Sequence, residues 1–330
     1  MRYDSFKVLL IGGAGFIGSH TAKALLKKDV DPIIFDSFYQ YIPTKGNDAH
    51  RVSALQKRFQ GLEDVPVVRG NAAHYREILN AIQQYQPNAI IHLGGLPIAN
   101  ISNQYGEEAM IGLQATHATI QAIHDYTRVP DRDAIRFVYI SSSTVYGDFE
   151  NVPASEEHPR NPKGVYAGVK LAGEEITKSF CKEFKIPFII IRPQAVYGPT
   201  DVNARVVQKF IESGIHGEEV EVRDPTVCAD FTYIDDIAEG IALATTSIEG
   251  INNTFNMSRG EGRTLGELVE IVQQYFPSLK TRMQSADSAL PRRGSLDILK
   301  ARSVFGFDPK YSLEEGVKAY VQYYQEGVRV

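Results

Sequence analysis

Short apolar runs alternate with longer amphipathic stretches along the chain as far as Pro199. The apolar runs predict buried strands at residues 7–11, 31–35, 65–68, 89–93, 136–140 and 188–191. The amphipathic stretches predict helices at about residues 16–27, 75–84, 106–126 and 165–184. Strands and helices that alternate in this way imply a parallel sheet with helices on both faces. The fold class predicted is therefore α/β, with ligands bound at the carboxyl ends of the strands.

This alternation ends after Pro199, where turn-rich segments surround predicted helices at about residues 204–213, 265–275 and 313–324. Residues 235–244 and 254–256 are predicted to return to the main sheet. We therefore expect a doubly wound Rossmann domain formed by residues 1–198 and about 231–258. A smaller, interleaved C-terminal lobe, expected to bind substrate, would comprise about residues 199–230 and 259–330.

Composition narrows the class of partner. The 35 Lys and Arg residues against 40 Asp and Glu residues give a net charge of -5, which provides no general attraction to nucleic acid or to an anionic membrane. Cys181 and Cys228 lie far apart and outside any CxxC spacing, so neither a disulfide framework nor a metal cluster is expected. The N-terminus leads directly into a strand without a long apolar stretch, which favours a cytoplasmic enzyme.

A glycine-rich turn follows the first strand and opens the first helix. Gly12, Gly15 and Gly18 form a GxxGxxG pattern, which permits a tight turn and close approach of a pyrophosphate to the backbone. Asp36, at the end of the second strand, is placed to accept hydrogen bonds from an adenosine ribose and to repel a 2′-phosphate. The pattern predicts a dinucleotide site that prefers NAD to NADP, although Asp36 could instead cap a turn.

Tyr166 and Lys170 are spaced i, i+4 on a predicted helix and therefore share one face. We expect the ammonium beside the phenol to lower the pKa of Tyr166 and so make the phenol an acid/base catalyst. The hydroxyl of Ser142 would polarise the same substrate oxygen. An ordinary pair of helix residues is the alternative interpretation of Tyr166 and Lys170.

Taken in order, these motifs resemble the extended short-chain dehydrogenase/reductases, specifically their nucleotide-sugar epimerase/dehydratase branch. The resemblance spans essentially the whole chain. Besides the glycine turn, it rests on these segments: Ser141-Ser142-Ser143-Thr144-Val145-Tyr146-Gly147, Tyr166-Ala-Gly-Val-Lys170, Arg192-Pro193-Gln194-Ala195-Val196-Tyr197-Gly198-Pro199, Asp230-Phe231-Thr232-Tyr233-Ile234-Asp235-Asp236 and Pro291-Arg292-Arg293-Gly294-Ser295-Leu296-Asp297.

The resemblance implies a role for each matching residue. Tyr166 would be the catalytic acid/base, Lys170 its ribose-binding partner and Ser142 the group that bonds the sugar oxygen. NAD would also contact Gly12, Gly15, Phe16, Ile17, Gly18, Asp36, Asn71, Leu93, Gly94 and Pro193. A nucleotide-sugar substrate would contact Ser143, Asn203, Arg205 and one arginine of the pair Arg292 and Arg293, with Arg292 taken as the candidate.

Three positions depart from the family pattern. Ala195 and Ala229 stand where many relatives have a diphosphate-contacting asparagine and an arginine, and Asn71 stands where an acidic residue is often placed near the adenine. These differences make Arg205 and Arg292 the candidate substitutes for holding the diphosphate.

The residues before Val145 bear on the type of reaction. Relatives that are 4,6-dehydratases carry an Asp-Glu pair there and uronic-acid decarboxylases carry a glutamate, whereas this chain has Ser143-Thr144. The preferred hypothesis is therefore a UDP-sugar 4-epimerase that forms a transient 4-keto sugar. Alternatives are a dehydratase, a decarboxylase or a 4-keto reductase and, in a different class, a catalytically silent NAD-sensing regulator.

The family resemblance also predicts a homodimer. Its interface would use the helix at about residues 106–126 and the helix that begins near Val165. The apolar residues of both helices could equally belong to the core of one chain.

Overall fold

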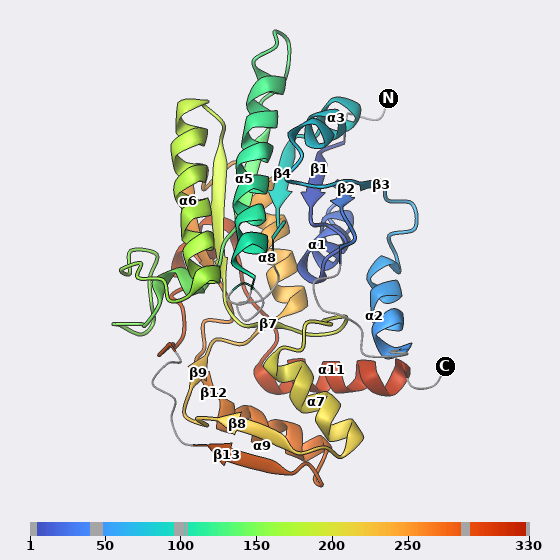
Figure 1. The fold of residues 1–330 in the computed structure, drawn as a ribbon, viewed down its shortest axis with the longest axis vertical. Coiled ribbons are helices and arrows are strands. Elements are labelled where there is room, and N and C mark those ends of the chain that lie inside the picture. Colours follow the sequence, from blue (N-terminus) through green and yellow to red (C-terminus); the bar gives the residue numbers. More distant parts are fainter. Residues whose placement is uncertain (1–4, 40–48, 96–101, 103–104, 285–290, 328–330) are drawn as a thin grey trace.

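The fold is described from a computed structural model, for residues 5–39, 49–95, 102, 105–284 and 291–327. Its centre is a seven-stranded sheet in the order β11-β6-β5-β4-β1-β2-β3, in which all neighbouring strands pair in parallel (Figure 1). The strands are β1 (Lys7–Ile11), β2 (Asp31–Asp36), β3 (Val67–Arg69), β4 (Ala89–His92), β5 (Arg136–Ile140), β6 (Phe188–Pro193) and β11 (Asn253–Met257). The predicted doubly wound α/β fold is confirmed.

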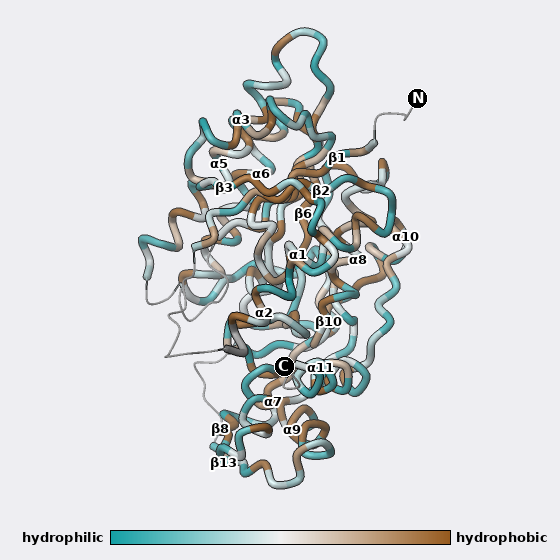
Figure 2. Tube along the Cα trace, turned by 90° about the vertical axis from the view of Figure 1, so that its right-hand side faces the viewer, coloured by the Kyte–Doolittle hydropathy of each residue, from teal (hydrophilic) through white to brown (hydrophobic). Residues whose placement is uncertain are grey.

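Alternate residues of each strand face opposite sides of this sheet. In β1, Val8 and Leu10 pack in the cluster that includes α1 (Phe16–Leu26) and α8 (Ile234–Thr246). Leu9 and Ile11 pack in the other cluster, with α3 (Tyr75–Tyr85), α5 (Gly106–Thr127) and α6 (Val165–Glu183). Because both faces are covered, the strands are continuous apolar runs, and the apolar trace in Figure 2 follows them through the middle of the molecule.

The strand order reverses at β1, which pairs with β2 on one side and with β4 on the other. In open α/β sheets, the crevice at such a reversal is where ligands bind. The loops after β1 and β4 approach each other closely at this point. A Cβ atom added to Gly12 would lie 3.2 Å from the backbone nitrogen of Gly94.

β7 and most of the segments after Pro199 lie beyond the carboxyl ends of the parallel strands, in the lower part of Figure 1, whereas α8, β11 and α10 pack with the main sheet. They include three two-stranded sheets, which pair β10 with β7, β12 with β9 and β13 with β8. The elements are β7 (Val196–Tyr197), α7 (Val206–His216), β8 (Val220–Arg223), β9 (Cys228–Ala229), β10 (Thr232–Tyr233), β12 (Arg263–Thr264), α9 (Leu265–Tyr275), β13 (Thr281–Gln284), α10 (Leu299–Phe305) and α11 (Leu313–Gly327).

Two predicted segments do return to the main sheet. Residues 254–256 lie in β11, which pairs in parallel with β6, and residues 235–244 lie in α8. An ion pair between Lys28 and Glu239 at 2.6 Å links the end of the α1 region to α8. The boundaries of the two interleaved lobes stay a prediction.

Several element boundaries differ from those predicted. The helix expected from residue 204 begins at Val206, because the backbone of Arg205 is extended and caps α7. The helix α2 (Ala49–Phe59) and the short helix η1 (Ser143–Tyr146) were not predicted. Among the described residues, no helix combines the length and the apolar character needed to cross a membrane.

Candidate active site

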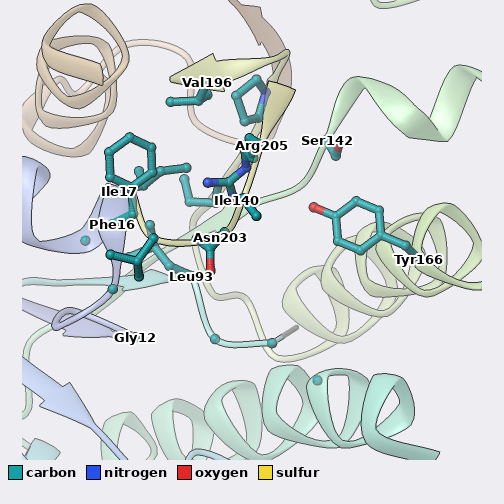
Figure 3. A pocket seen from close by; sticks show the side chains of 18 of the residues that line it. Gly12, Phe16, Ile17, Leu93, Ile140, Ser142, Tyr166, Val196, Asn203 and Arg205 are labelled. Atoms are coloured by element: carbon teal, nitrogen blue, oxygen red, sulfur yellow. The ribbon is translucent and has the colours of Figure 1, made fainter. Parts of the chain in front are cut away.

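A pocket of about 1380 Å³ opens at the carboxyl ends of β1, β2, β4, β5 and β6 (Figure 3). The loops that follow these strands form one side of it. Residues of α2, α5, α6, α7 and β8 contribute to the rest of the lining. This volume exceeds the roughly 300–1,000 Å³ of a typical small-molecule site, so it has room for two large ligands.

The glycine turn lines the pocket beside β1. Gly12 adopts a φ of +80°, which a residue with a side chain rarely adopts. A Cβ atom on Gly18 would lie 2.4 Å from the carbonyl oxygen of Gly12 and 2.7 Å from the Cα of Gly13. The first turn of α1 therefore packs directly on this loop, and both line the pocket, where the N-terminus of a helix favours a phosphate.

Asp36 is held rigidly at the end of β2. Its Oδ2 accepts the backbone N–H of Ala14 at 3.0 Å, and its Oδ1 accepts that of Phe38 at 2.7 Å. Burial raises the pKa of Asp36, and these hydrogen bonds and the nearby Arg58 oppose the rise. Each carboxylate oxygen keeps a further lone pair, so Asp36 can still accept hydrogen bonds from a ribose.

Tyr166, Lys170 and Ser142 all line the pocket, and Tyr166 and Lys170 lie close together, as their i, i+4 spacing predicts. The hydroxyl of Tyr166 points into the pocket, on the side where Ser142 lies (Figure 3). The Nζ of Lys170 lies 6.0 Å from the centre of the Tyr166 ring and donates a hydrogen bond to the carbonyl of Ile140 at 2.8 Å. The Oγ of Ser142 accepts the backbone N–H of Thr144 at 3.2 Å, which fixes the start of η1.

Lys170 was expected to lower the pKa of Tyr166, and this prediction is wrong. Burial raises the pKa of Tyr166, and the groups that oppose this rise are Arg205, the Ser142 side chain and Arg293. Burial also lowers the pKa of Lys170 to about 8, against the charge of Glu174. The i, i+4 spacing gave the correct neighbour but not the sign of the shift, because desolvation of the phenol outweighs the surrounding charges.

A buried ion pair behind the site was missed in the sequence. Glu174 accepts hydrogen bonds from Arg192 at 2.8 and 2.6 Å and from the hydroxyl of Ser141 at 2.6 Å. Arg192 also donates to the hydroxyl of Tyr146 at 2.7 Å. This network ties α6 and β6 to the loop that carries Ser142. The spacing of Glu174, one helical turn after Lys170, is the only sequence feature that pointed to it.

The pocket brings together nearly all the residues predicted to bind ligands. Those that line it are Gly12, Gly15, Phe16, Ile17, Gly18, Asp36, Asn71, Leu93, Gly94, Ser142, Ser143, Tyr166, Lys170, Pro193, Asn203 and Arg205. Two of them are already held by Asp201, whose Oδ1 accepts from Asn203 at 3.0 Å and from Arg205 at 2.8 Å.

Arg292 is the exception. Its side chain is exposed and does not line the pocket, whereas the partly buried Arg293 does. Two backbone hydrogen bonds fix which of the two side chains lines the pocket. The N–H of Arg292 donates to Asp148 at 2.9 Å, and its carbonyl accepts from Phe149 at 2.8 Å. The prediction chose the wrong member of the pair, since Arg293 and not Arg292 lines the pocket.

Within the part of the chain that the structure describes, no three His, Cys, Asp or Glu side chains are grouped so as to hold a metal ion. The acidic residues that line the pocket are Asp36, Glu219 and Glu221. They come from the end of β2 and from β8 and its start, rather than from η1 or α6.

Known proteins are similar to this chain over nearly its whole length. A model of the NAD dependent epimerase/dehydratase family matches residues 8–258. An uncharacterised UDP-glucose epimerase of Bacillus subtilis is 26% identical, with 96% of this chain and 97% of that protein covered. A dTDP-glucose 4,6-dehydratase of Xanthomonas campestris is 24% identical, with 96% and 92% covered.

A solved structure, UDP-glucuronic acid 4-epimerase from Bacillus cereus in complex with UDP-glucuronic acid and NAD, has a similar fold. Its TM-score is 0.85 at 24% identity, with 97% of this chain and 99% of that chain covered.

Proposed function

The chain belongs to the NAD dependent epimerase/dehydratase family, and from this membership we propose that it is a nucleotide-sugar 4-epimerase acting on a UDP-sugar. One observation carries the proposal most directly. The pocket contains the phenol, the ammonium and the hydroxyl needed for reversible oxidation at C4, and it lacks a carboxylate on η1 or α6. Elimination of water needs such an acid and base, whereas inversion does not.

The residues present fit the cofactor NAD. The glycines let α1 and the loop after β4 pack closely on the turn, since a Cβ atom on Gly18 or Gly12 would meet backbone there, and the turn lines the pocket. Asp36 and Lys170 are placed to accept from and donate to ribose hydroxyls, and Pro193 lies at the end of β6 on the pocket wall. When bound, NAD takes up a hydride from the sugar and later gives it back.

The chain's own residues then move the proton. Tyr166 takes the proton of the C4 hydroxyl and later returns it to the C4 oxygen, when C4 has the opposite configuration. The Ser142 hydroxyl donates a hydrogen bond to the same oxygen. Arg205 and Arg293 lower the cost of forming the phenolate. Inversion requires the 4-keto sugar to turn over in the site, and the volume of about 1380 Å³ leaves room for that rotation.

The diphosphate of the substrate needs cations, because Ala195 and Ala229 supply none. Arg205 at the N-cap of α7, Lys209 on α7 and Arg223 on β8 line the pocket. Charge-assisted hydrogen bonds from such residues are the usual way to hold phosphate. We assign the nucleotide end of the pocket to this side.

The test is to incubate the purified protein with a panel of nucleotide sugars and to follow the configuration at C4 by NMR. The expected result is an equilibrium mixture of the two C4 epimers, without accumulation of NADH. Loss of 18 or 44 mass units from the sugar would instead identify a dehydratase or a decarboxylase. NAD binding without turnover of any sugar would support the sensing regulator.

A homodimer and a cytoplasmic location stay predictions. Met110 on α5 and Val165 at the start of α6 are exposed, at 54% and 40%, on the two helices where the interface is expected. Sedimentation of the purified protein tests the dimer, and fractionation of cells tests the location.

A further inference from the structure

The ammonium of Lys170 needs more than one partner, because it has three N–H donors and lies in a partly buried part of the pocket. One N–H donates to the carbonyl of Ile140 at 2.8 Å. The carboxylate of Glu174 acts on the ammonium through its charge, but it accepts two hydrogen bonds from Arg192, at 2.8 and 2.6 Å. Because that carboxylate is already paired, a further group must support the charge of Lys170.

The aromatic ring of Tyr139 lies against this ammonium. The Nζ of Lys170 lies over the ring of Tyr139, 5.4 Å from its centre, and is closer to it than to the ring centre of Tyr166 at 6.0 Å. A cation within about 6 Å of a ring centre is attracted by the quadrupole of the ring, and the attraction grows where water is excluded. Tyr139 is only 3% exposed. The two side chains therefore make a buried cation–π contact.

The local sequence of β5 and α6 places the ring at this position. Tyr139 alternates with Val138 and Ile140 along β5, so it faces the side of the sheet that α5 and α6 cover. On α6, Gly173 follows Lys170 by three residues and shares its face of the helix. A Cβ atom on Gly173 would lie 2.1 Å from the hydroxyl of Tyr139. The glycine therefore lets the ring reach under the helix that carries Lys170.

Among the described residues, the titratable groups that face Lys170 are Tyr166 and Glu174 on α6, Tyr139 on β5 and His92 on β4. The ring of His92 stacks on that of Tyr139 with centres 6.0 Å apart, and its nitrogens face two threonine hydroxyls of α5 at 3.2 and 3.4 Å. Burial lowers the pKa of His92 to about 3, so this ring adds no second cation. Burial raises the pKa of Tyr139, so its ring stays a neutral phenol.

We propose that Tyr139 is a positioning residue for cofactor binding, whose neutral ring holds the ammonium of Lys170 in its charged form where it meets the ribose of NAD. This inference rests on the part of the proposed function in which Lys170 donates to that ribose. Water is the competing partner of the ammonium. A cavity of about 20 Å³, lined by Tyr139, Tyr166 and Lys170 among others, has room for about one water molecule.

The experiment follows the titration of Lys170 itself. The lysines of the full-length protein are labelled with carbon-13 at Cε, and their chemical shifts are recorded by NMR from about pH 6 to about pH 10. The signal of Lys170 is identified by its absence from Lys170→Met. The wild-type midpoint is expected near pH 8, because burial lowers the pKa of Lys170 to about 8. Tyr139→Leu removes the ring face, so we expect the midpoint to fall by about one pH unit.

Two further variants separate the ring face from the hydroxyl and from packing. Tyr139→Phe keeps the ring, so its midpoint should stay within about 0.3 pH units of the wild type. Phe137→Leu is the matched control, because Phe137 is a buried ring on the same face of β5 that also packs beside His92. Its midpoint should not move. An unchanged midpoint in Tyr139→Leu, or an equal fall in Phe137→Leu, overturns the proposal. A rise in Tyr139→Leu also overturns it, since water would then support the ammonium better than the ring.

The affinity for NAD, measured by calorimetry, links the ring to the cofactor. In Tyr139→Leu it should fall about fivefold at pH 8 and less than about twofold at pH 6, where Lys170 is charged in both proteins. An equal fall at both pH values would show a packing defect and overturn the proposal. If the midpoint moves but neither Tyr139→Leu nor Lys170→Met weakens NAD binding, the ribose role of Lys170 fails and only the cation–π contact stands. If Lys170→Met weakens NAD binding but Tyr139→Leu moves no midpoint, the ribose role stands and the contact fails.

Discussion

The two ends of the pocket differ in how their polar groups are satisfied. At the cofactor end, both oxygens of Asp36 accept backbone N–H groups and Lys170 donates to the carbonyl of Ile140. At the sugar end, Thr144 Oγ1 and Arg293 Nε have no partner among the described residues. The cofactor end is therefore preorganised by the fold itself. The sugar end keeps polar atoms that the fold itself does not satisfy.

Tyr166 lies where the two ends meet, and its replacement is expected to have the largest effect. Tyr166→Phe removes the phenolic proton while keeping the ring, so turnover should fall by about 10³-fold, within the range for loss of an acid/base group. NAD content, measured by absorbance of the denatured protein, should not change. Loss of NAD together with turnover would mean that Tyr166 belongs to the cofactor end alone.

The packing of the glycine turn predicts the next largest effect. In Gly18→Ala the new methyl group meets the carbonyl oxygen of Gly12, which is backbone and cannot move away cheaply. We expect NAD affinity to fall by about 30-fold, equivalent to about 2 kcal/mol of strain. Gly106→Ala is the control, since nothing lies within 4 Å of its added Cβ atom. Unchanged NAD affinity in Gly18→Ala would show that the turn is not the phosphate site.

A pH titration of NAD binding examines the cofactor end without a mutation in the turn. Burial lowers the pKa of Lys170 to about 8, so the side chain is charged below that pH and neutral above it. If NAD binds the charged form, its affinity should fall by about 10-fold between pH 7 and pH 9. Lys170→Met should bind NAD more weakly at pH 7 and show no such step. A step that persists in this variant would assign the titration to another group.

The smallest effect is expected at the sugar end, from a single hydroxyl. Thr144→Val keeps the shape of the side chain and removes one neutral hydrogen bond, so kcat/KM for the preferred sugar should fall by about 5-fold. Affinity for NAD should stay the same. Because Thr144 Oγ1 has no protein partner, the free energy of unfolding should rise slightly or not change. A clear loss of stability would show that the hydroxyl already has a partner in the folded chain.

The same contrast separates what was predictable from the sequence from what was not. Strand periodicity and the position of the glycine turn predicted the sheet and the cofactor end, because both are fixed by local backbone geometry. The choice between Arg292 and Arg293 was not predictable. It depends on a hydrogen bond that Asp148 accepts from the Arg292 N–H and on one that Gln194 donates to the Gly294 carbonyl, each partner about a hundred or more residues away in the chain. The raised pKa of Tyr166 likewise depends on burial, which the spacing of Tyr166 and Lys170 does not reveal.

Deuterium at C4 of the sugar tests the central claim most directly. A 4-epimerase that holds its cofactor returns the hydrogen to the carbon from which it came, so the inverted product of a C4-deuterated UDP-sugar should keep the label. Mass spectrometry with NMR should show deuterium at C4 of both epimers and no NADH in solution. Inverted product without the label at C4, or release of one NADH for each sugar consumed, would contradict the account.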